Sequence, residues 1–452
     1  MTSLADTVVG ALATVLSPEQ VLPGTRREYL RDATEGRGIE GRADAIVFPR
    51  TSEETAAALA WCYEHGVPIV PRGGGTGFAG GAVPQGGVVV CTEQLRSIRS
   101  FDPLLWRIEV EAGIRTAEVR LRAREHGLLF PPDPGAAEQS HIGGNIATNA
   151  GGPHAFKYGT AGAWVTGVEA VVPPGDIIRL GGSFRKDVSG LDLKSLLIGS
   201  EGTLAIITAA WLRLLPAPEA AFPVVAFFSD HASGCAGVEA VIGNGIAAST
   251  LDYLDGGALE LAGASYPGDV PAGARFAVLA EADGSLSEAA RIRDELVEVF
   301  GEAAIRVASP DSKELWRWRD GVSIAVTAAR GGKVSEDIEV PVDRLAEAVA
   351  GTVEIGHHHG LTALSWGHAG DGNLHATFLV ARHDAAGHRA ADRACAELFE
   401  LARDLGGTIS GEHGLGILKR DKAAWPARIA ALQQGVKGAF DPKGLRNPGK
   451  KL

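Results

Sequence analysis

The chain has 452 residues, of which 45% are hydrophobic and 22% charged, which is the composition of a soluble globular protein with room for two or three domains. Its net charge of −12, with no basic stripe, argues against nucleic acid as the main partner. The 60 glycines are about twice the average share and cluster in short runs, which favours contact between the backbone and a ligand.

Neither a targeting segment nor a membrane span is expected. Residues 1–16 contain Asp6 and lack the basic start of a signal peptide. The apolar run at 220–228 is too short to cross a bilayer. The four cysteines are far apart without Cys-x-x-Cys spacing, which excludes the usual iron–sulfur cluster and gives no disulfide framework. We expect a cytoplasmic protein, and attachment to a membrane through a partner stays open.

The first half of the chain predicts helices and strands in alternation. The expected elements are a helix at 3–16, a strand at 45–49, a helix at 53–65, strands at 67–70, 88–92 and 106–111, and a helix at 116–126. Ser52 is the expected N-cap of the second helix, because glutamates follow it at the positive end of the helix dipole. This order of elements indicates an α/β or α+β unit.

Prolines at 216 and 218 mark the expected end of the first domain. Beyond them the glycine-rich loops stop, and strands at 224–228 and 276–281 alternate with helices at 231–242 and 285–300. The last segment regains glycine, proline and basic residues. We therefore expect three parts, at residues 1–215, 216–406 and 407–452.

Three glycine-rich segments in the first part predict a cofactor site. Arg72–Gly81 has few side chains to block its amides, so its N–H groups can surround a pyrophosphate. It has neither the lysine of an ATPase P-loop nor the helix and acidic residue of a Rossmann fingerprint. Ser140–Gly152 and Gly199–Ile207 place small residues where a flat ring system can lie against the backbone. For each segment alone, a surface loop or an ordinary turn is the alternative.

The stretch Ser365–Phe378 predicts a β-hairpin that holds two imidazoles together. Asp371-Gly372 is a strong signal for a two-residue type I′ turn, which would place His368 directly opposite His375. Directly opposed residues have Cβ atoms about 4.5–5.5 Å apart, and two histidines at that distance can share one divalent ion. A tight hairpin with incidental histidines is the alternative.

A third ligand and a base are available in Glu412-His413, which follows an expected strand at 408–410. Two histidines and a carboxylate with open positions are typical of a catalytic metal site rather than a structural one. Arg319 has a planar guanidinium suited to bidentate recognition of a carboxylate. Taken alone, a surface charge on a helix is the simpler interpretation of Arg319.

Six motifs occur along the chain in a fixed order. They are Pro71–Gly77, Gly143–Gly152, Gly199–Thr203, Gly367–His375, Gly411–Gly414 and Asn447–Lys450. In this order they resemble the flavin-dependent dehydrogenases of the vanillyl-alcohol-oxidase type, in the branch that acts on D-2-hydroxy acids (D-lactate dehydrogenase, D-2-hydroxyglutarate dehydrogenase and the FAD subunit of glycolate oxidase). The resemblance covers nearly the whole chain. It implies an α+β fold: a two-subdomain FAD-binding domain with an inserted cap domain of antiparallel sheet plus helices.

The resemblance also implies which residues hold FAD. Those around the pyrophosphate would be Arg72, Gly73, Gly74, Gly75, Thr76 and Gly77. Those along the flavin and its linker would be Ser140, Gly144, Asn145, Thr148 and Gly151. Further contacts would be Glu201, Gly202, Ile206 and Asn447. Relatives that tether FAD covalently carry His or Cys in the first glycine loop, and this chain has neither there, so we expect non-covalent FAD.

The resemblance further implies that His368, His375 and Glu412 bind Zn²⁺, with Mn²⁺ as the alternative, and that His413 is the catalytic base. Chelation by such an ion would lower the pKa of the substrate hydroxyl, whose proton His413 would accept. The Cα hydride would pass to flavin N5, and Arg319 would pair with the substrate carboxylate.

One departure from the family pattern bears on the substrate. Relatives that act on longer dicarboxylates carry a lysine shortly before an Asp-x-x-x-Pro strand, which here is Asp337–Pro341. Lys333 stands two residues earlier than that spacing, and Ser335 takes its place. This argues against 2-hydroxyglutarate and for a smaller acid such as D-lactate or glycolate.

The expected partners are the small 2-hydroxy acid and an electron acceptor, which would be a quinone, an electron-transfer flavoprotein or an iron–sulfur subunit. A homodimer stays open. Two other functions stay open as well. One is a flavin-dependent transferase similar to alkyl-dihydroxyacetonephosphate synthase, for which His357–His359 is a parallel to that enzyme's histidine run. The other is a non-catalytic flavin-binding subunit of a larger redox complex.

Overall fold

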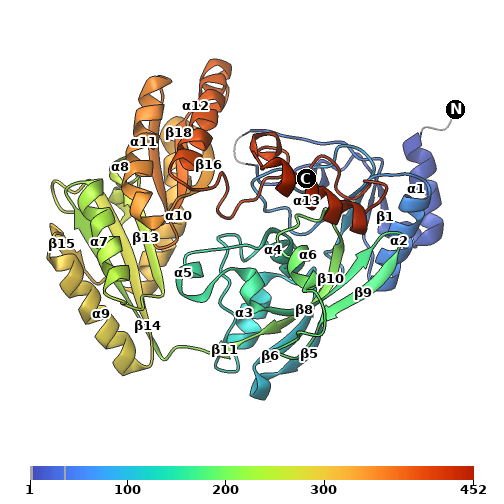
Figure 1. Cartoon of the computed structure of the whole chain (residues 1–452), viewed down its shortest axis with the longest axis horizontal. Coiled ribbons are helices and arrows are strands. Elements are labelled where there is room, and N and C mark those ends of the chain that lie inside the picture. The colour runs from blue at the N-terminus through green and yellow to red at the C-terminus, as the bar shows by residue number, and fades with distance from the viewer. Residues whose placement is uncertain (1–3, 35–36) are drawn as a thin grey trace.

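Two lobes make up the chain in the computed structural model, which describes residues 4–34 and 37–452 (Figure 1). The first lobe contains a four-stranded and a five-stranded sheet, and the second is built on one seven-stranded sheet. Helices and mainly antiparallel sheets are combined in both lobes, which confirms the expected α+β class.

The four-stranded sheet has the order β1-β2-β4-β3, with β4 parallel to both of its neighbours. Its elements are β1 (Val21–Pro23), β2 (Ala45–Val47), β3 (Ile69–Arg72) and β4 (Val88–Cys91), with α1 (Leu4–Val15) and α2 (Ser52–Glu64) packed on them. Residue 3 of the first expected helix lies outside the described residues. The N-cap prediction was wrong: Thr51 accepts from the Glu54 N–H, whereas the Ser52 hydroxyl donates to buried Glu169.

The five-stranded sheet is antiparallel, and its apolar face packs on two helices that lead into the glycine-rich segments. In the order β5-β6-β10-β8-β9 its strands are β5 (Ile98–Asp102), β6 (Arg107–Glu111), β10 (Ile206–Arg213), β8 (Val165–Val172) and β9 (Asp176–Gly181), covered by α3 (Thr116–Arg124) and α4 (Ile142–Thr148). β5 was not predicted, because it is an edge strand without a buried residue. Smaller elements are β7 (Leu128–Leu129), β11 (Leu215–Pro216), α5 (Ala155–Tyr158) and α6 (Leu193–Leu197).

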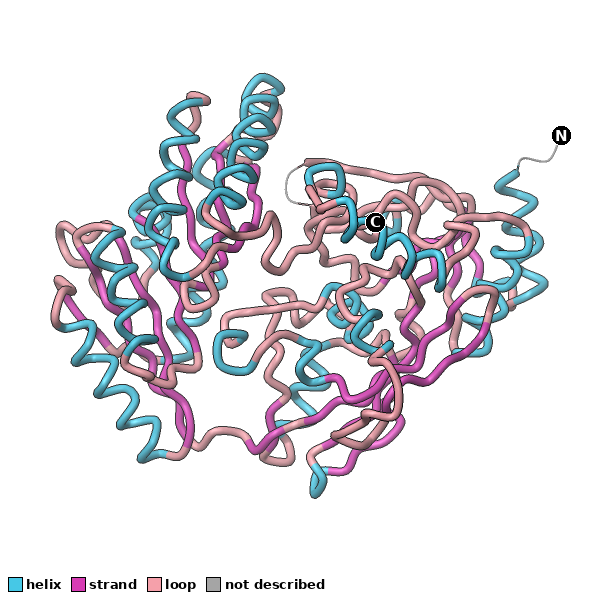
Figure 2. Tube along the Cα trace, viewed as in Figure 1, coloured by secondary structure: helices cyan, strands magenta, loops and turns pink. Residues whose placement is uncertain are grey.

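In the second lobe, strands and helices lie side by side (Figure 2). Its seven-stranded sheet is antiparallel throughout, as expected for the cap domain. In sheet order its strands are β15 (Arg306–Ala308), β12 (Ala220–Phe228), β14 (Phe276–Gly284), β13 (Thr250–Asp255), β17 (Thr362–His368), β18 (Asn373–Leu379) and β16 (Lys333–Glu339). One face is covered by α7 (His231–Gly243), α9 (Leu286–Gly301), α11 (Leu345–His358) and α12 (Ala385–Asp404), and the other by α8 (Gly256–Ala262) and α10 (Ser312–Arg330). Burial on both faces explains the unbroken apolar run of β12.

The predicted register of the central hairpin was wrong. β17 and β18 close on the pair His368–Asn373, so His375 lies opposite Trp366 instead of His368. A type I′ turn needs positive φ at both central residues, and of the predicted pair only Gly372 has it, at φ 78°. The loop therefore covers residues 369–372. His368 and His375 remain on one face as diagonal neighbours, with ring centroids 5.5 Å apart.

The C-terminal segment returns to the first lobe, where its helix α13 (Ala427–Phe440) lies (Figure 1). Ile69 of β3 forms a bridge with Arg446, and Lys437 of α13 donates to the Thr203 carbonyl. The division at residues 215 and 406 stays a prediction. The expected strand at 408–410 is reduced to one bridge between Thr408 and Glu339. Among the described residues, no helix has the length and apolar character that crossing a membrane requires.

His154, which precedes α5, links the two lobes. Its Nδ1 lies 2.5 Å from Asp133 in the first lobe, and its Nε2 lies 3.1 Å from Glu281 on β14. Burial alone would lower the pKa of His154, but the two carboxylates outweigh it and raise this pKa to about 10. Nearby, Lys157 and Tyr158 both donate to Asp283 of β14, which makes this edge a polar contact between the lobes.

We expect His154→Gln to destabilise the protein by about 2–4 kcal/mol at pH 6, because two buried carboxylates lose a cationic partner. A free histidine has a pKa of about 6.5, so the stabilisation is fully present below that pH and is lost as the pH rises to about 10. Thermal unfolding of the wild type and the variant at pH 6, 8 and 10 measures it. A difference in Tm that grows with pH would contradict the ion-pair role.

Candidate active site

A cavity of about 410 Å³ lies between the glycine-rich segments of the first lobe and the hairpin of the second. Each of the three glycine-rich segments contributes to its wall. The predicted cofactor residues that line it are Arg72, Gly73, Gly74, Gly75, Thr76, Gly77, Ser140, Gly144, Asn145, Thr148, Gly151, Glu201, Gly202 and Ile206. The predicted metal and catalytic residues that line it are Arg319, His368, His375, Glu412 and His413. Residues up to 381 positions apart in the sequence, Asp32 and His413, thus share one cavity.

The glycines of this wall fit a bound cofactor. A Cβ at Gly77 or Gly144 would meet no atom within 4 Å, so a side chain there would project into the cavity instead of into the protein. At Gly74 a Cβ would come within 2.1 Å of the Gln139 carbonyl, so the loops also approach each other too closely for any side chain. The wall is therefore backbone, with amides accessible to phosphate and ring atoms.

Three predicted cofactor residues use their side chains to hold the loops together. The Arg72 guanidinium donates to the carbonyls of Glu28 and Arg31. The Glu201 carboxylate accepts from the N–H groups of Leu415 and Gly416, at 2.9 and 2.7 Å. The Asn447 amide donates to the carbonyls of Gly81 and Glu201 and is not part of the cavity wall. For Arg72 and Glu201, contact with the cofactor would come from the backbone.

Ser140 and Asn145 meet at a buried threonine that the sequence did not indicate. The Ser140 hydroxyl lies 2.9 Å from that of Thr116, and the Asn145 amide donates to the same oxygen. All three side chains are buried. This triad holds the start of α4 against α3, which fixes the second glycine-rich segment along the cavity.

His368, His375 and Glu412 form a possible metal site. Their ligand atoms lie within 4.8 Å of one another. The Nε2 atoms of His368 and His375 are 3.7 and 3.6 Å from the same Glu412 oxygen. His368 Nδ1 lies 2.7 Å from Asp252 of β13, which leaves Nε2 for a metal, as in many metal sites where a carboxylate orients the histidine. The donor set is that of catalytic zinc.

Burial and neighbouring charges shift the pKa values of His368, His375 and Glu412 in different directions. Burial alone would lower the pKa of His368, but Asp252 and Glu412 raise it to about 10. Burial lowers the pKa of His375 to about 3. Burial would raise the pKa of Glu412, yet the neighbouring histidines lower it to about 2. Near neutral pH these values leave Glu412 ionised, His375 neutral and His368 protonated, so a metal that binds here would have to displace the proton of His368.

His413 lies beside this group. Its ring stacks on that of His375, with centroids 5.2 Å apart and an interplanar angle of 7°, and Phe78 packs 4.7 Å away. His413 Nε2 is 3.5 Å from the Glu412 oxygen that the two other histidines approach. The imidazole that the sequence analysis expects to be the base therefore lies next to the donor set.

Arg319 of α10 is 8% exposed and is not a surface charge. Its Nε donates to Asp252 at 2.6 Å, and Asp252 is the carboxylate that also contacts His368. Its second terminal nitrogen is buried without a partner among the described residues. A buried unpaired guanidinium N–H is costly, and an anion in the cavity would satisfy it.

The structure adds residues that the sequence did not single out. Asp252 and Asp337 lie across the sheet from His368 and His375. Asp252 belongs to no motif in the sequence. Asp337 is the first residue of the Asp-x-x-x-Pro motif, which could have drawn attention to it. The other additions line the cavity: Phe78, His141, Asp320, Ser323 and Trp366.

Comparison with protein families matches two models. Residues 43–181 match "FAD binding domain", and residues 217–451 match "FAD linked oxidases, C-terminal domain". Glycolate oxidase subunit GlcD of Bacillus subtilis is 33% identical over 96% of both chains. D-lactate dehydrogenase of Anaerostipes hadrus is 32% identical over 96% of this chain and 95% of its own. D-2-hydroxyglutarate dehydrogenase of Xanthomonas citri is 33% identical over 96% of both chains.

Solved structures share the fold. p-Cresol methylhydroxylase superposes with a TM-score of 0.80 at 18% identity, over 99% of this chain and 96% of its own. Alkyldihydroxyacetonephosphate synthase superposes with a TM-score of 0.78 at 18% identity, over 98% of this chain and 84% of its own. At such low identity the likeness concerns architecture alone.

Proposed function

This chain belongs to the FAD-linked oxidases, and from that membership we propose that it oxidises a D-2-hydroxy acid to the 2-keto acid with FAD as the hydride acceptor. The relatives that cover nearly its whole length are named for glycolate, D-lactate and D-2-hydroxyglutarate. One observation carries the proposal most: a proton acceptor, a metal donor set and a guanidinium with an unpaired N–H face the same cavity as the glycine-rich segments.

Each residue of the site has a separate task in the proposed oxidation. Arg319 binds the substrate carboxylate and orients the acid. His413 takes the hydroxyl proton at Nε2, the ring nitrogen on the side of Glu412. Bound FAD, held non-covalently, supplies the hydride acceptor. A divalent ion held by His368, His375 and Glu412, Zn²⁺ or Mn²⁺, supplies Lewis acidity for the hydroxyl. Asp252 links the proposed carboxylate-binding residue to the proposed metal ligand, because it contacts both Arg319 and His368.

The cavity wall at Ser335 favours a small acid such as D-lactate or glycolate. Ser335, not a lysine, lines it, and its hydroxyl is bonded to that of Thr377. Lys333 is the first residue of β16. Its ammonium donates to Ser323 at 2.6 Å and lies 4.9 Å from the Trp366 ring. Lys333 itself is not among the residues that line the cavity.

The electrons need an acceptor outside this chain. A relative named as a subunit of glycolate oxidase supports a partner subunit, with a quinone or an electron-transfer flavoprotein as the other acceptors. Four buried, unpaired cysteines support a reducing, cytoplasmic setting. For the transferase alternative, His358 and His359 would be the relevant groups, but they pair with Glu397 outside the cavity wall.

An anaerobic screen of flavin reduction tests the proposal. The purified holoprotein is mixed with D-lactate, glycolate, D-2-hydroxyglutarate and the L-isomers, and the bleaching of the flavin absorbance is followed. We expect rapid bleaching by a small D-2-hydroxy acid and slow bleaching by D-2-hydroxyglutarate. A flavin that no 2-hydroxy acid reduces would favour the transferase or the non-catalytic subunit.

Arg319→Lys is expected to raise KM for the acid about tenfold with a smaller change in kcat, because lysine keeps the charge beside Asp252 but loses the planar pair of donors. Steady-state kinetics measure the two constants separately. Arg317→Lys on the exposed face of the same helix is the matched control and should leave both constants unchanged. An unchanged KM in Arg319→Lys would remove the carboxylate contact.

A further inference from the structure

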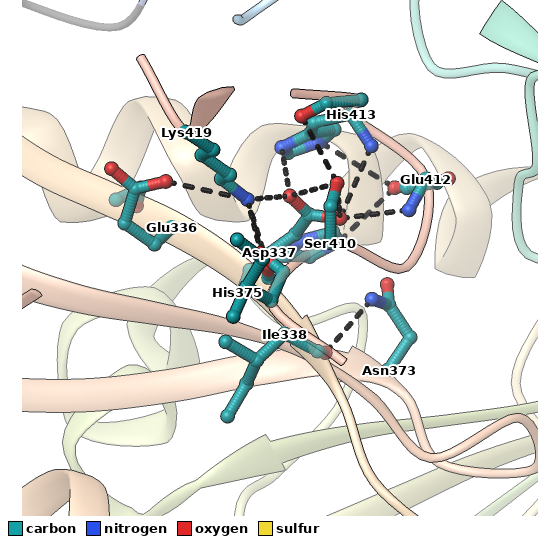
Figure 3. Close-up of polar contacts among 12 residues, drawn as sticks. Glu336, Asp337, Ile338, Asn373, His375, Ser410, Glu412, His413 and Lys419 are labelled. Atoms are coloured by element: carbon teal, nitrogen blue, oxygen red, sulfur yellow. Dashed lines mark hydrogen bonds and ion pairs between the residues drawn. The ribbon is translucent and has the colours of Figure 1, made fainter. Parts of the chain in front are cut away.

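Asp337 is a fully buried carboxylate behind the candidate base, and nothing above gives it a task. It lies on β16 directly across from His375 on β18, and it is 0% exposed. One of its oxygens accepts from the backbone N–H groups of Glu412 and His413, at 2.7 and 3.1 Å (Figure 3). The Ser410 hydroxyl donates to it as well, at 3.2 Å. The carboxylate therefore gathers the loop that carries a metal ligand and the base.

The same carboxylate faces the His413 ring. His413 Nδ1 is 3.5 Å from Asp337 Oδ1, while Nε2 lies on the opposite side, 3.5 Å from Glu412 (Figure 3). A carboxylate on one ring nitrogen favours the proton there and leaves the lone pair on the other nitrogen. Glu412 lies equally close to Nε2, but Glu412 belongs to the metal donor set, so with an ion bound there Asp337 would remain as the carboxylate that can accept a ring proton, from Nδ1.

Lys419 fixes the position of Asp337 through an ion pair and hydrogen bonds. It is 2% exposed, and its ammonium is bonded to the Asp337 carboxylate, to the Asp337 carbonyl at 2.8 Å and to the Ile409 carbonyl at 2.9 Å. Glu336 lies 3.3 Å from the same ammonium and is itself paired with Arg37. An ammonium has three hydrogens, and each finds an acceptor here.

This pairing keeps Asp337 ionised inside the protein. Burial would raise the pKa of Asp337, but Lys419 and His413 hold it well below its usual range. Burial would lower the pKa of Lys419, and the carboxylates of Asp337 and Glu336 raise it instead. Breaking one partner of such a pair leaves an uncompensated charge, so the two residues depend on each other.

We propose that Asp337, fixed by Lys419, is the positioning residue of His413: it orders the Gly411–Gly416 loop and presents ring nitrogen Nε2 to the substrate hydroxyl. This rests on the proposed function, in which His413 is the proton acceptor. Asp337 itself touches neither the cavity nor the metal donor atoms. Its effect passes through the orientation and the tautomer of one ring.

The first test is Asp337→Asn, which keeps the shape and one acceptor oxygen for the loop N–H groups. We expect the limiting rate of flavin reduction by the substrate to fall by about 100-fold or more, with little change in the substrate concentration at half-saturation and with FAD retained. Asp283→Asn is the matched control, because Asp283 is an equally buried carboxylate paired with a lysine at the lobe boundary. It should lower Tm and leave the reduction rate unchanged.

Lys419→Met is the second variant and covers the case in which Asp337→Asn does not fold. We expect the same direction of change in the reduction rate, because the carboxylate then loses the ammonium that fixes it. Lys419→Arg keeps a cation and should recover part of the rate. A folded Asp337→Asn or Lys419→Met protein that reduces its flavin at the wild-type rate would overturn the proposal and leave the proposed function standing.

A measurement on the resting protein tests the ring without any turnover. In protein with ¹⁵N-labelled histidine, NMR distinguishes a protonated from an unprotonated ring nitrogen, and the His413→Gln variant identifies the signals. We expect His413 to carry its proton on Nδ1 in the wild type and to lose that preference in Asp337→Asn. A wild-type ring protonated on Nε2 alone would overturn the proposal even if every hydroxy acid fails to reduce the flavin.

Discussion

His413→Gln is expected to slow flavin reduction by the 2-hydroxy acid by about 10³-fold while FAD stays bound. His413 lies outside the three glycine-rich segments proposed to hold FAD, so the flavin absorbance should remain. The loss follows from the chemistry: a hydroxyl proton must leave with the hydride, and a positioned base contributes about 10²–10⁴-fold. Anaerobic stopped-flow mixing with the best substrate of the screen measures the rate directly.

The matched control for this variant is His358→Gln. His358 is exposed at the end of α11 and pairs with Glu397, outside the cavity. It should reduce its flavin at the wild-type rate. Normal flavin reduction in His413→Gln would end the assignment of His413 as the base, whereas a slow His358→Gln would point to the transferase-like histidine run.

Removal of the metal is expected to cost about 100-fold or more in activity, recoverable with Zn²⁺ or Mn²⁺. The three donor groups converge on one point and leave positions open for the substrate oxygens, so without an ion the hydroxyl loses its Lewis acid. Metal analysis before and after treatment with EDTA, together with the rate of flavin reduction, measures the effect. FAD content should not change, because the glycine-rich segments supply none of the three donor atoms.

Two variants sharpen the metal experiment. His375→Gln removes a donor and should lower the bound metal and the activity together. His359→Gln removes a histidine from the His–Glu group on α11 and α12, and should leave both unchanged. A metal-free protein with full activity would remove the metal from the mechanism and leave Glu412, His368 and His375 as a cluster of neighbouring polar side chains.

Much of the site could be predicted from the sequence because its motifs are local. Glycine runs predicted a wall of accessible backbone, and three of these segments line the cavity. The order of six motifs predicted the family. The hairpin was predicted as an element but not in its register. The turn signal of Asp371-Gly372 considers two residues, while the loop is also set by Gly370, whose N–H donates to the Leu251 carbonyl of the neighbouring strand.

Arg319 is a second case in which the interpretation from the sequence and the structure differ. In the sequence it looks like a helix surface charge, since charged and aromatic residues alternate around it. In the structure α10 packs on the sheet so that Arg319 is buried against Asp252, a residue 67 positions away. No local pattern identifies such a partner, because a buried ion pair depends on which face of a helix meets which strand.

The sequence by itself determined the family and, through that resemblance, the fold class, and it proposed the flavin-binding segments, the ligands and the base. These depend on residue type and short-range spacing, which glycine conformation and the chemistry of imidazole and carboxylate fix locally. The tertiary structure alone decided the hairpin register, the burial of Arg319 and the roles of Asp252, Asp337 and Lys419. Each of these depends on strands and helices that pair across long sequence separations, where packing and the cost of an unpaired buried charge select the partner.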